Sequence, residues 1–306
     1  MNRISFKAMG SQMMAALEES STENPNGLEL VPQWFERWES RFSRFREGSE
    51  LSRLNYAQGS PVVVSPLFLE VLKKALKIDQ ATDGLVTPFA LRALEIAGYN
   101  CSFEHIHSPS MQQKDIEPSR HLPDIQVSIS NRSIEIPRNT GIDLGGFVKG
   151  WAADRAARRL SKMGPALVDA GGDIAVNGPR RNGNPWPIGI QNPLDSQQEM
   201  GLILLRKGGV STSGKDQRNW INIDGTMSHH IIDPRTGLPV ITDLLSATVI
   251  ATSAHLAEVA AKMTLLLGSH AGLAWLEQQN HTEAFIVLDD GEALMSSGMH
   301  QHLWRA

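Results

Sequence analysis

Apolar residues recur at the spacing of an amphipathic helix in four separate parts of the chain. One of these segments also has capping residues: Ser65 suits an N-cap, Pro66 suits the first turn, and Asp83-Gly84 suits the C-terminal end. The pattern therefore predicts helices over residues 28–46, from Ser65-Pro66 to Asp83-Gly84, over 148–163, and over 252–268.

Alternating apolar and polar residues predict strands before and between these helices. A first strand is expected within residues 3–17, and the alternation from Ile125 to Ile136 around Ser130-Asn131-Arg132 predicts a hairpin. Turns of few residues separate most of the later strands, which favours antiparallel pairing. Those strands are expected at Ala166–Asp169, Ile174–Val176, Ile188–Gln191, Gly201–Leu205, His229–Ile232, Ala247–Ala251 and, as the last, Ala284–Leu288.

Helices at separated places and strands mostly in runs predict an α+β fold with mostly antiparallel sheets and flanking helices. Residues 102–124 are polar, and they suit a loop or a short hairpin. This segment is the best candidate for a boundary, but the chain from 1 to 306 is expected to form one domain, with two intimate lobes as the alternative.

Composition narrows the possible partners. The formal net charge of −4 gives no broad attraction for nucleic acid or for an anionic membrane. The single cysteine, Cys101, excludes an intrachain disulfide. We expect no membrane span and no secretory signal, because no long apolar run is evident, and hence a cytoplasmic location.

The glycine-rich segment 141–160 is the first candidate for chemistry. Gly145 and Gly146 allow a close approach of the backbone to a ligand, and the N-terminus of the following helix favours an anion such as a pyrophosphate. Lys149 could reach a phosphate oxygen, and Asp143 could bind a ribose, a ring nitrogen or a metal. Taken alone, the segment is explained better by a plain strand-to-helix turn with a surface lysine.

Each of four further segments has a functional and a purely structural interpretation. Gly171-Gly172 before Asp173 suits either a ligand-binding bulge or a hairpin whose aspartate caps its own turn. Residues 211–220 suit either an anion-binding loop or an ordinary polar loop. His229 and His230 should face opposite sides of a strand, one inward and one outward. Glu258 and Lys262 share one helix face and could form a simple ion pair.

The order of these motifs resembles the flavin transferase (ApbE) family. The series is MGS, SxFxxxSELSRLN, DLGGxxKGxAxDRA, AGGDIxxNG, SG, SHHIIDPRTGxP and TVIAxxAxxAE, from Met9 to about Gly268. The resemblance implies one α+β flavin transferase domain that takes FAD as substrate with magnesium. It also implies transfer of FMN to a Ser or Thr of a target protein, with release of AMP.

Carried over by position, the resemblance implies a set of site residues. The FAD contacts fall on Met9, Phe45, Leu85, Val86, Thr87, Asp143, Lys149 and the backbone of Ile232. The metal contacts fall on Gly146, Glu258, Ala261 and Lys262. Catalytic work falls on His230, near the acceptor hydroxyl, and on Asp143.

Three positions depart from the family pattern. Phe45 lacks the hydroxyl of the common aromatic residue, and Val86-Thr87-Pro88-Phe89 stands where Phe-Asp-x-Thr is common. Ala257–Lys262 stands where Ala-Asp-x-x-x-Thr is usual, so a lysine replaces an oxygen ligand of the metal.

The side chain of Lys262 has two possible positions. Its ammonium either occupies the place of the metal and pairs with Glu258, which is our hypothesis, or turns outward and leaves a weakened metal site. Two alternative functions also remain: an FAD pyrophosphatase, in which water replaces the acceptor hydroxyl, and an FAD-binding protein without catalysis.

Overall fold

The computed structural model of the chain describes residues 1–18, 27–103, 106, 128–130, 132–222, 225 and 227–304. The chain divides into two compact units. Unit 1 comprises Met1–Glu36, Lys149–Gln217 and Thr242–Ala306, and unit 2 comprises Arg37–Val148 and Arg218–Ile241. The loop expected at 102–124 lies almost entirely outside the described residues, and the single domain stays a prediction.

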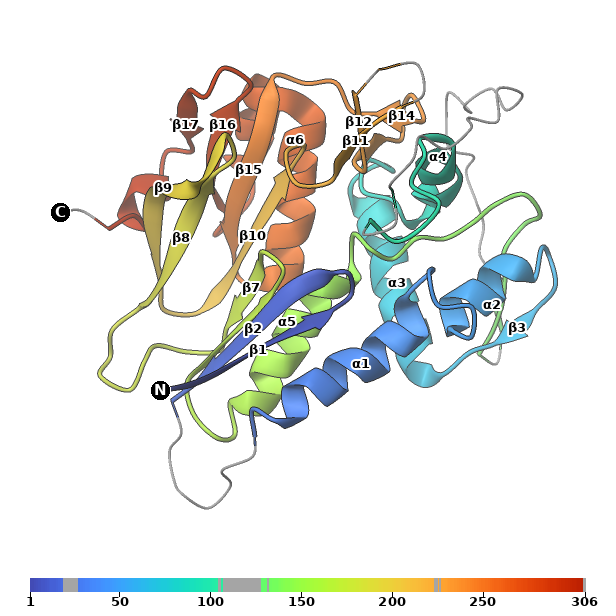
Figure 1. Cartoon of the computed structure of the whole chain (residues 1–306), viewed down its shortest axis with the longest axis horizontal. Coiled ribbons are helices and arrows are strands. Elements are labelled where there is room, and N and C mark those ends of the chain that lie inside the picture. The colour runs from blue at the N-terminus through green and yellow to red at the C-terminus, as the bar shows by residue number, and fades with distance from the viewer. Residues whose placement is uncertain are drawn as a thin grey trace. The chain divides into compact units, whose positions relative to one another are not determined.

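Unit 1 is built on an eight-stranded sheet whose neighbouring strands all pair antiparallel (Figure 1). In sheet order the strands are β1 (Asn2–Ala8), β2 (Ser11–Leu17), β6 (Ala166–Ala170), β7 (Asp173–Val176), β10 (Gly208–Gly214), β15 (Leu244–Ala251), β16 (Glu283–Leu288) and β17 (Ala293–Met295). This sheet confirms the mostly antiparallel α+β fold.

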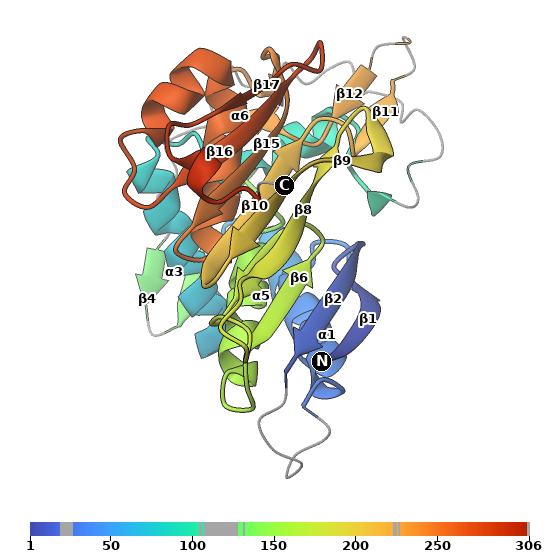
Figure 2. The ribbon, with the colours of Figure 1, turned by 90° about the vertical axis from the view of Figure 1, so that its left-hand side faces the viewer.

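Different elements cover the two faces of this sheet. Helix α6 (Ala254–Leu276) packs on β7, β10, β15 and β16, and Gly209 of β10 faces it, since a Cβ there would lie 2.1 Å from the Ala254 nitrogen. Val210 points to the other face. There it joins an apolar core with the hairpin of β8 (Trp186–Asn192) and β9 (Asp195–Leu205), which Figure 2 shows beside β10.

The remaining elements of unit 1 flank this core. Helix α5 (Val148–Leu160) starts at the last residue of unit 2 and otherwise belongs to unit 1, and the short 3₁₀ turn η3 (Met299–Gln301) follows β17. Helix α1 (Leu30–Phe42) begins in unit 1 and ends in unit 2, and in unit 1 its Phe35 ring meets Phe6 of β1 edge-on at 5.3 Å.

Unit 2 contains short helices and small antiparallel sheets. Its helices are α2 (Glu50–Tyr56), α3 (Pro66–Ala81), the 3₁₀ turn η1 (Pro88–Ala90) and α4 (Leu91–Ile96). One sheet has the order β3 (Val62–Val63), β5 (Ser133–Glu135) and β4 (Ser128–Ser130). The hairpins are β11 (Asn219–Ile221) with β12 (Met227–His229) and β13 (Ile232–Asp233) with β14 (Leu238–Pro239).

All four predicted helices are present. The Ser65 hydroxyl accepts the N–H of Phe68, so Ser65 is the N-cap of α3, and Pro66 occupies the first turn. The last helix, however, continues past Gly268 to Leu276. Gly268 has a φ of 81°, and Asp243 accepts the N–H of Ser269 at 2.9 Å, so the chain kinks there and restarts.

Several strand predictions need correction. The single strand expected at 3–17 is a hairpin, because Met9 and Gly10 have φ values of 50° and 64° and turn the chain back. The strand expected at His229–Ile232 is interrupted after His229, and the last strand is β17 rather than β16. Residues 211–214 lie in β10 and not in a loop.

Helix α6 is long and apolar enough, by length and composition alone, to cross a membrane. More than half of its most apolar window is buried within the protein, where it packs on the sheet. A buried core helix satisfies the same criteria, so this helix gives little support for a membrane span.

Candidate functional site

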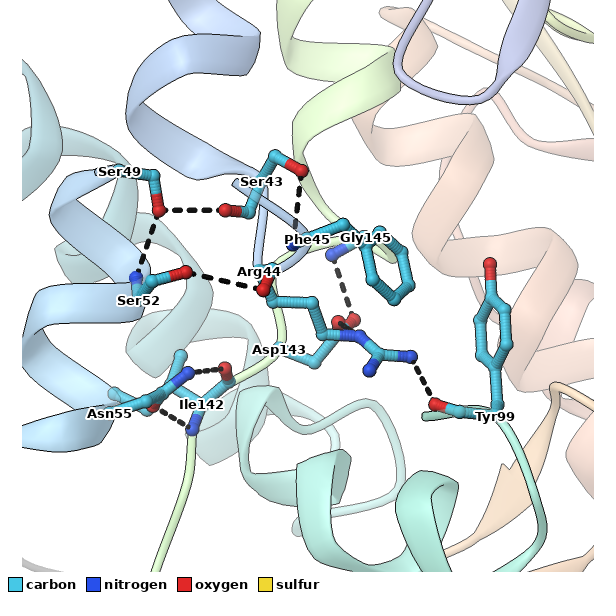
Figure 3. Close-up of polar contacts among 10 residues, drawn as sticks. All are labelled: Ser43, Arg44, Phe45, Ser49, Ser52, Asn55, Tyr99, Ile142, Asp143 and Gly145. Carbon is cyan, nitrogen blue, oxygen red and sulfur yellow. Dashed lines mark hydrogen bonds and ion pairs between the residues drawn. The ribbon is translucent and has the colours of Figure 1, made fainter. Parts of the chain in front are cut away.

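Hydroxyl side chains fold residues 43–55 into a loop followed by α2 (Figure 3). The Ser49 hydroxyl accepts the N–H of Ser52 at 2.9 Å and donates to the Ser43 carbonyl at 2.7 Å. The Ser52 hydroxyl donates to the Arg44 carbonyl at 3.2 Å. Because Ser49 caps the helix while holding the loop before it, these serines fix the backbone that carries Arg44 and Phe45.

Asn55, at the end of this motif, holds the segment that carries Asp143. Its amide donates to the Ile142 carbonyl at 2.9 Å, and its carbonyl oxygen accepts the Ile142 N–H at 2.8 Å. The Asn55 side chain thus pairs with Ile142 as a neighbouring strand would. The backbone N–H of Asp143 then donates to the Pro88 carbonyl at 2.8 Å, which ties the stretch after Thr87 to the same place.

Asp143 forms a salt bridge with Arg44. The Arg44 Nε lies 2.9 Å from Asp143 Oδ2, and the side chains are only 6% and 17% exposed. The other carboxylate oxygen, Oδ1, accepts the N–H of Gly145 at 2.9 Å. Arg44 also donates to the Tyr99 carbonyl at 2.7 Å, so it joins three segments of unit 2 (Figure 3).

Aromatic rings surround the Arg44 guanidinium. Its central carbon lies 4.1 Å from the centre of the Phe45 ring and 4.7 Å from that of Tyr99. Tyr99 in turn stacks on Trp220 with ring centres 5.7 Å apart. Phe45 is 39% exposed, so an aromatic surface next to a cation is open to a planar ligand.

His229 and His230 differ in their surroundings, but the strand ends at His229, so the alternation expected for the two residues does not apply. His229 is buried, its Nδ1 accepts the N–H of Ile231 at 3.3 Å, and its Nε2 lies 3.1 Å from the Val240 carbonyl. The proton therefore belongs on Nε2, and both ring nitrogens hold backbone. His230 lies beyond the strand, and its ring is edge-on to that of Tyr99 with ring centres 6.5 Å apart.

The segment 85–87 is held by local hydrogen bonds. The Thr82 hydroxyl accepts the N–H of Val86 at 3.1 Å, and Thr87 caps η1 by accepting the N–H of Phe89 at 3.3 Å. Ile232 is buried in β13, within the apolar cluster that contains Tyr99. Unit 2 therefore brings Phe45, Asp143 and His230 to one aromatic cluster, and residues 85–87 adjoin it through Pro88.

In unit 1, two hairpin turns lie side by side at one end of the sheet. The turn at Met9-Gly10 joins β1 to β2, and the turn at Gly171-Gly172 joins β6 to β7. Gly171 has a φ of 70°, and a Cβ there would lie 2.6 Å from Ser11 Cβ. Only glycine fits at this position, which explains the AGG motif beside the MGS motif.

Asp173 does not cap its own turn, because the Asp169 carboxylate accepts the N–H of Gly172 at 2.8 Å. Asp173 instead accepts hydrogen bonds from Lys149 Nζ at 2.5 Å and from the buried Ser211 hydroxyl. Its side chain is 2% exposed. The buried carboxylate of Asp173 therefore joins the start of β7 to the first turn of α5 and to β10.

Glu258 is a second buried carboxylate in unit 1. Its Oε2 accepts the N–H of Gly150 at 3.1 Å, and its Oε1 lies 3.4 Å from Lys262 Nζ one turn later in α6. A Cβ on Gly150 would lie 2.8 Å from the Ala254 carbonyl oxygen. The missing side chain therefore allows α5 to approach α6 closely enough for this hydrogen bond.

Burial raises the pKa of three of the groups described above. Burial raises the pKa of Glu258, and the charges of Lys262 and Lys149 and the Gly150 N–H oppose this shift. Burial also raises the pKa of Asp169, against the hydrogen bond from Gly172. In unit 2, burial raises the pKa of Tyr99 while Arg218 and Arg44 lower it.

The residues implied as magnesium ligands in unit 1 do not suit that ion. Magnesium needs oxygen ligands in near-octahedral geometry. Both oxygens of Glu258 are engaged by other groups, Ala261 lies inside a helix, and Lys262 places a cation next to the carboxylate. Within the described part of the chain, no three His, Cys, Asp or Glu side chains are grouped to hold a metal.

Sequence reasoning missed Tyr99, the stacking of Trp220 on it, the bond from Ser211 to Asp173 and the role of Arg44. Tyr99 lies outside every candidate segment, and Trp220 ends the segment 211–220 without any sign that it stacks on Tyr99, so their meeting depends on the fold alone. Ser211 was interpreted as part of a polar loop, but it lies in β10. A short run of small hydroxyl residues next to apolar ones also suits a buried strand, and that signal could have indicated it.

Unit 1 is an antiparallel α+β structure with two glycine turns at one end of a large sheet, where Lys149 pairs with Asp173 at the start of β7. Such an arrangement suits a protein that binds a phosphate-bearing ligand. A sequence profile of the ApbE family matches residues 9–286. The chain therefore belongs to the ApbE family.

Relatives of known name are similar over most of their length. An FAD:protein FMN transferase of Vibrio cholerae serotype O1 is 29% identical over 85% of this chain and 79% of its own. An FAD:protein FMN transferase of Escherichia coli K12 is 29% identical over 81% of this chain and 73% of its own.

Solved structures give the same result for the fold. The crystal structure of the ApbE protein from Thermotoga maritima has a TM-score of 0.87 at 26% identity and covers 99% of both chains. The flavin transferase ApbE from Vibrio cholerae has a TM-score of 0.79 at 24% identity, again over 99% of both chains.

Proposed function

We propose that this chain is an FAD:protein FMN transferase that attaches FMN from FAD to a Ser or Thr of a target flavoprotein. The observation that carries the proposal is the similarity to the Vibrio cholerae and Escherichia coli proteins of that name over most of their chains. The reaction releases AMP, so FAD is a substrate and a second protein is the partner.

The proposed transfer exchanges one phosphorus–oxygen bond for another. The acceptor hydroxyl oxygen bonds to the phosphorus of the FMN half, and the bond from that phosphorus to the bridging oxygen breaks. AMP leaves with the bridging oxygen, and the hydroxyl proton passes to a base. His230 is our candidate base, because both ring nitrogens of His229 are used to hold backbone.

The remaining site residues have roles that their surroundings support. In unit 2, Phe45 and the adjoining Arg44 offer an aromatic face and a cation to a flavin or adenine ring, and Asp143 holds Arg44 in place. In unit 1, Lys149 is the candidate for a phosphate contact. Such a reaction depends mainly on positioning and charge neutralisation.

Mass spectrometry of a candidate flavoprotein co-expressed with this chain tests the proposal. We expect a mass gain of one FMN on the target, lost with His230→Ala and kept with His270→Ala, which removes an exposed histidine of α6. No gain on any target, although the chain binds FAD, would overturn the proposal and favour the FAD-binding protein without catalysis.

Incubation of the chain with FAD alone separates the transferase from an FAD pyrophosphatase. A transferase without its acceptor leaves FAD intact, whereas a pyrophosphatase produces free FMN and AMP. We further propose a cytoplasmic location, which fractionation of cells that express the chain would test.

A further inference from the structure

Glu258 and Lys262, both in helix α6 of unit 1, form an ion pair. The side chain of Glu258 is 3% exposed and that of Lys262 is 21% exposed, so the carboxylate is buried and the ammonium reaches the surface. The second oxygen of Glu258 accepts the N–H of Gly150. The pair therefore presents a positive charge outward and keeps its negative charge inside.

Asp173 and Lys149 repeat this arrangement. Asp173 is buried at 2% exposure, and Lys149, at 20%, again reaches the surface. Ser211 supplies Asp173 with a further hydrogen bond. Asp173 and Glu258 thus each have an ammonium of their own, and within these two pairs the charges balance without a divalent ion.

A divalent cation at Glu258 would meet two obstacles. Magnesium requires oxygen atoms at about 2.0–2.1 Å, and a charged lysine provides only N–H donors. The Lys262 ammonium would also repel the ion from a distance of only a few ångströms. An ammonium can instead bind a carboxylate and a phosphate oxygen at the same time, because it has three donors.

We propose that Lys262 supplies the positive charge for the diphosphate of FAD in this chain, and that neither binding nor transfer needs a divalent metal. The proposal rests on the proposed function and adds how this chain neutralises its substrate. Since the helix places Lys262 four residues after Glu258, the carboxylate holds the ammonium in position.

The deciding measurement is FAD affinity of the wild-type chain in EDTA and in magnesium. We expect the two dissociation constants to agree within about twofold, a difference of only about 0.4 kcal/mol. FMN transfer to a target protein should likewise persist in EDTA. Affinity that rises about tenfold or more with magnesium, or transfer that stops in EDTA, would overturn the inference and leave the transferase intact.

Two variants sharpen the test. Lys262→Thr removes the cation and adds an oxygen, so we expect FAD binding to become magnesium-dependent by about tenfold. Lys262→Met removes only the charge, so FAD affinity should fall and magnesium should not restore it. Lys207→Thr, at an exposed lysine of unit 1, is the matched control and should behave as wild type.

A readout without FAD adds independent evidence. Manganese binding, followed by its electron paramagnetic resonance signal, should be absent from the wild-type chain and present in Lys262→Thr. Tight manganese binding by the wild type would overturn the inference. If the wild-type chain neither binds FAD nor transfers FMN in either buffer, the proposed function itself fails, and the inference with it.

Discussion

The Nζ of Lys149 lies 2.5 Å from the Oδ2 of Asp173, so two motifs separated by 24 positions meet in one buried ion pair. Lys149 comes from the first turn of α5, and Asp173 comes from the start of β7. The pair holds the helix against the sheet next to the glycine turns. Lys149, which the resemblance assigns to FAD binding, therefore also has a partner within the protein.

Asp173→Asn should destabilise the protein by about 2 kcal/mol. Breaking a fully buried pair costs about 3–5 kcal/mol, and Lys149 is partly exposed, which reduces the loss. Urea denaturation measures the change, and a double-mutant cycle with Lys149→Met separates the pair from the loss of the Ser211 hydrogen bond. If the coupling energy in that cycle is near zero, the ion pair contributes nothing to stability.

Arg44→Lys should weaken FAD binding roughly tenfold, about 1.4 kcal/mol. A lysine keeps the charge but lacks the planar guanidinium, which contacts the rings of Phe45 and Tyr99. It also cannot form the salt bridge to Asp143 and the hydrogen bond to the Tyr99 carbonyl at the same time in this geometry. Fluorescence titration with FAD checks this expectation. Arg53→Lys, at an exposed position of α2, is the matched control, and an equal effect of both variants would contradict the role of Arg44.

Gly150→Ala should destabilise the protein by about 2 kcal/mol, although alanine favours a helix by about 1 kcal/mol over glycine. The added Cβ would lie 2.8 Å from the Ala254 carbonyl oxygen, so α5 and α6 must separate and the bond to Glu258 is lost. Thermal unfolding shows whether the variant is less or more stable than the wild type. Gly178→Ala, where a Cβ has open space, should be nearly neutral, and stabilisation by Gly150→Ala would refute the close approach.

Glu18→Gln should destabilise the protein at neutral pH and have little effect in acid. The Arg181 N–H first, and then Arg180, lower the pKa of Glu18 below its ordinary value of 4.5, against burial. A carboxyl with a lowered folded-state pKa stabilises the protein above 4.5 and loses that contribution as the pH falls through the folded-state pKa. Urea denaturation at pH 7 and pH 3 tests this, and an equal loss at both values would exclude a charge effect.

Local sequence was enough to predict most helices and the α+β class. The Ser65 cap, for example, lies three residues from the N–H that it accepts, so all the information is in one short segment. The hairpin at Met9-Gly10 was missed, because a methionine with positive φ is uncommon and gives no turn pattern.

The chemistry-bearing residue types were also evident in the sequence, but their partners were not. Asp143 was identified as a ligand candidate, whereas its salt bridge to Arg44 was not foreseen. Likewise, the sequence left open whether Asp173 binds a ligand or caps its own turn. The structure shows that Asp173 pairs with Lys149 and that Asp169 accepts the N–H in the turn.

The sequence by itself determined the family, the order of motifs and the placing of Glu258 and Lys262 on one helix face, because residues four apart on a helix are neighbours. It left open whether Lys262 pairs with Glu258 or turns outward, and the structure shows the pair. Only the tertiary structure decided which groups those side chains meet. Gly150 and Glu258 are 108 residues apart, and their hydrogen bond exists because α5 and α6 pack closely at a residue without a side chain. Contacts of this kind depend on packing between distant segments, which no local pattern records.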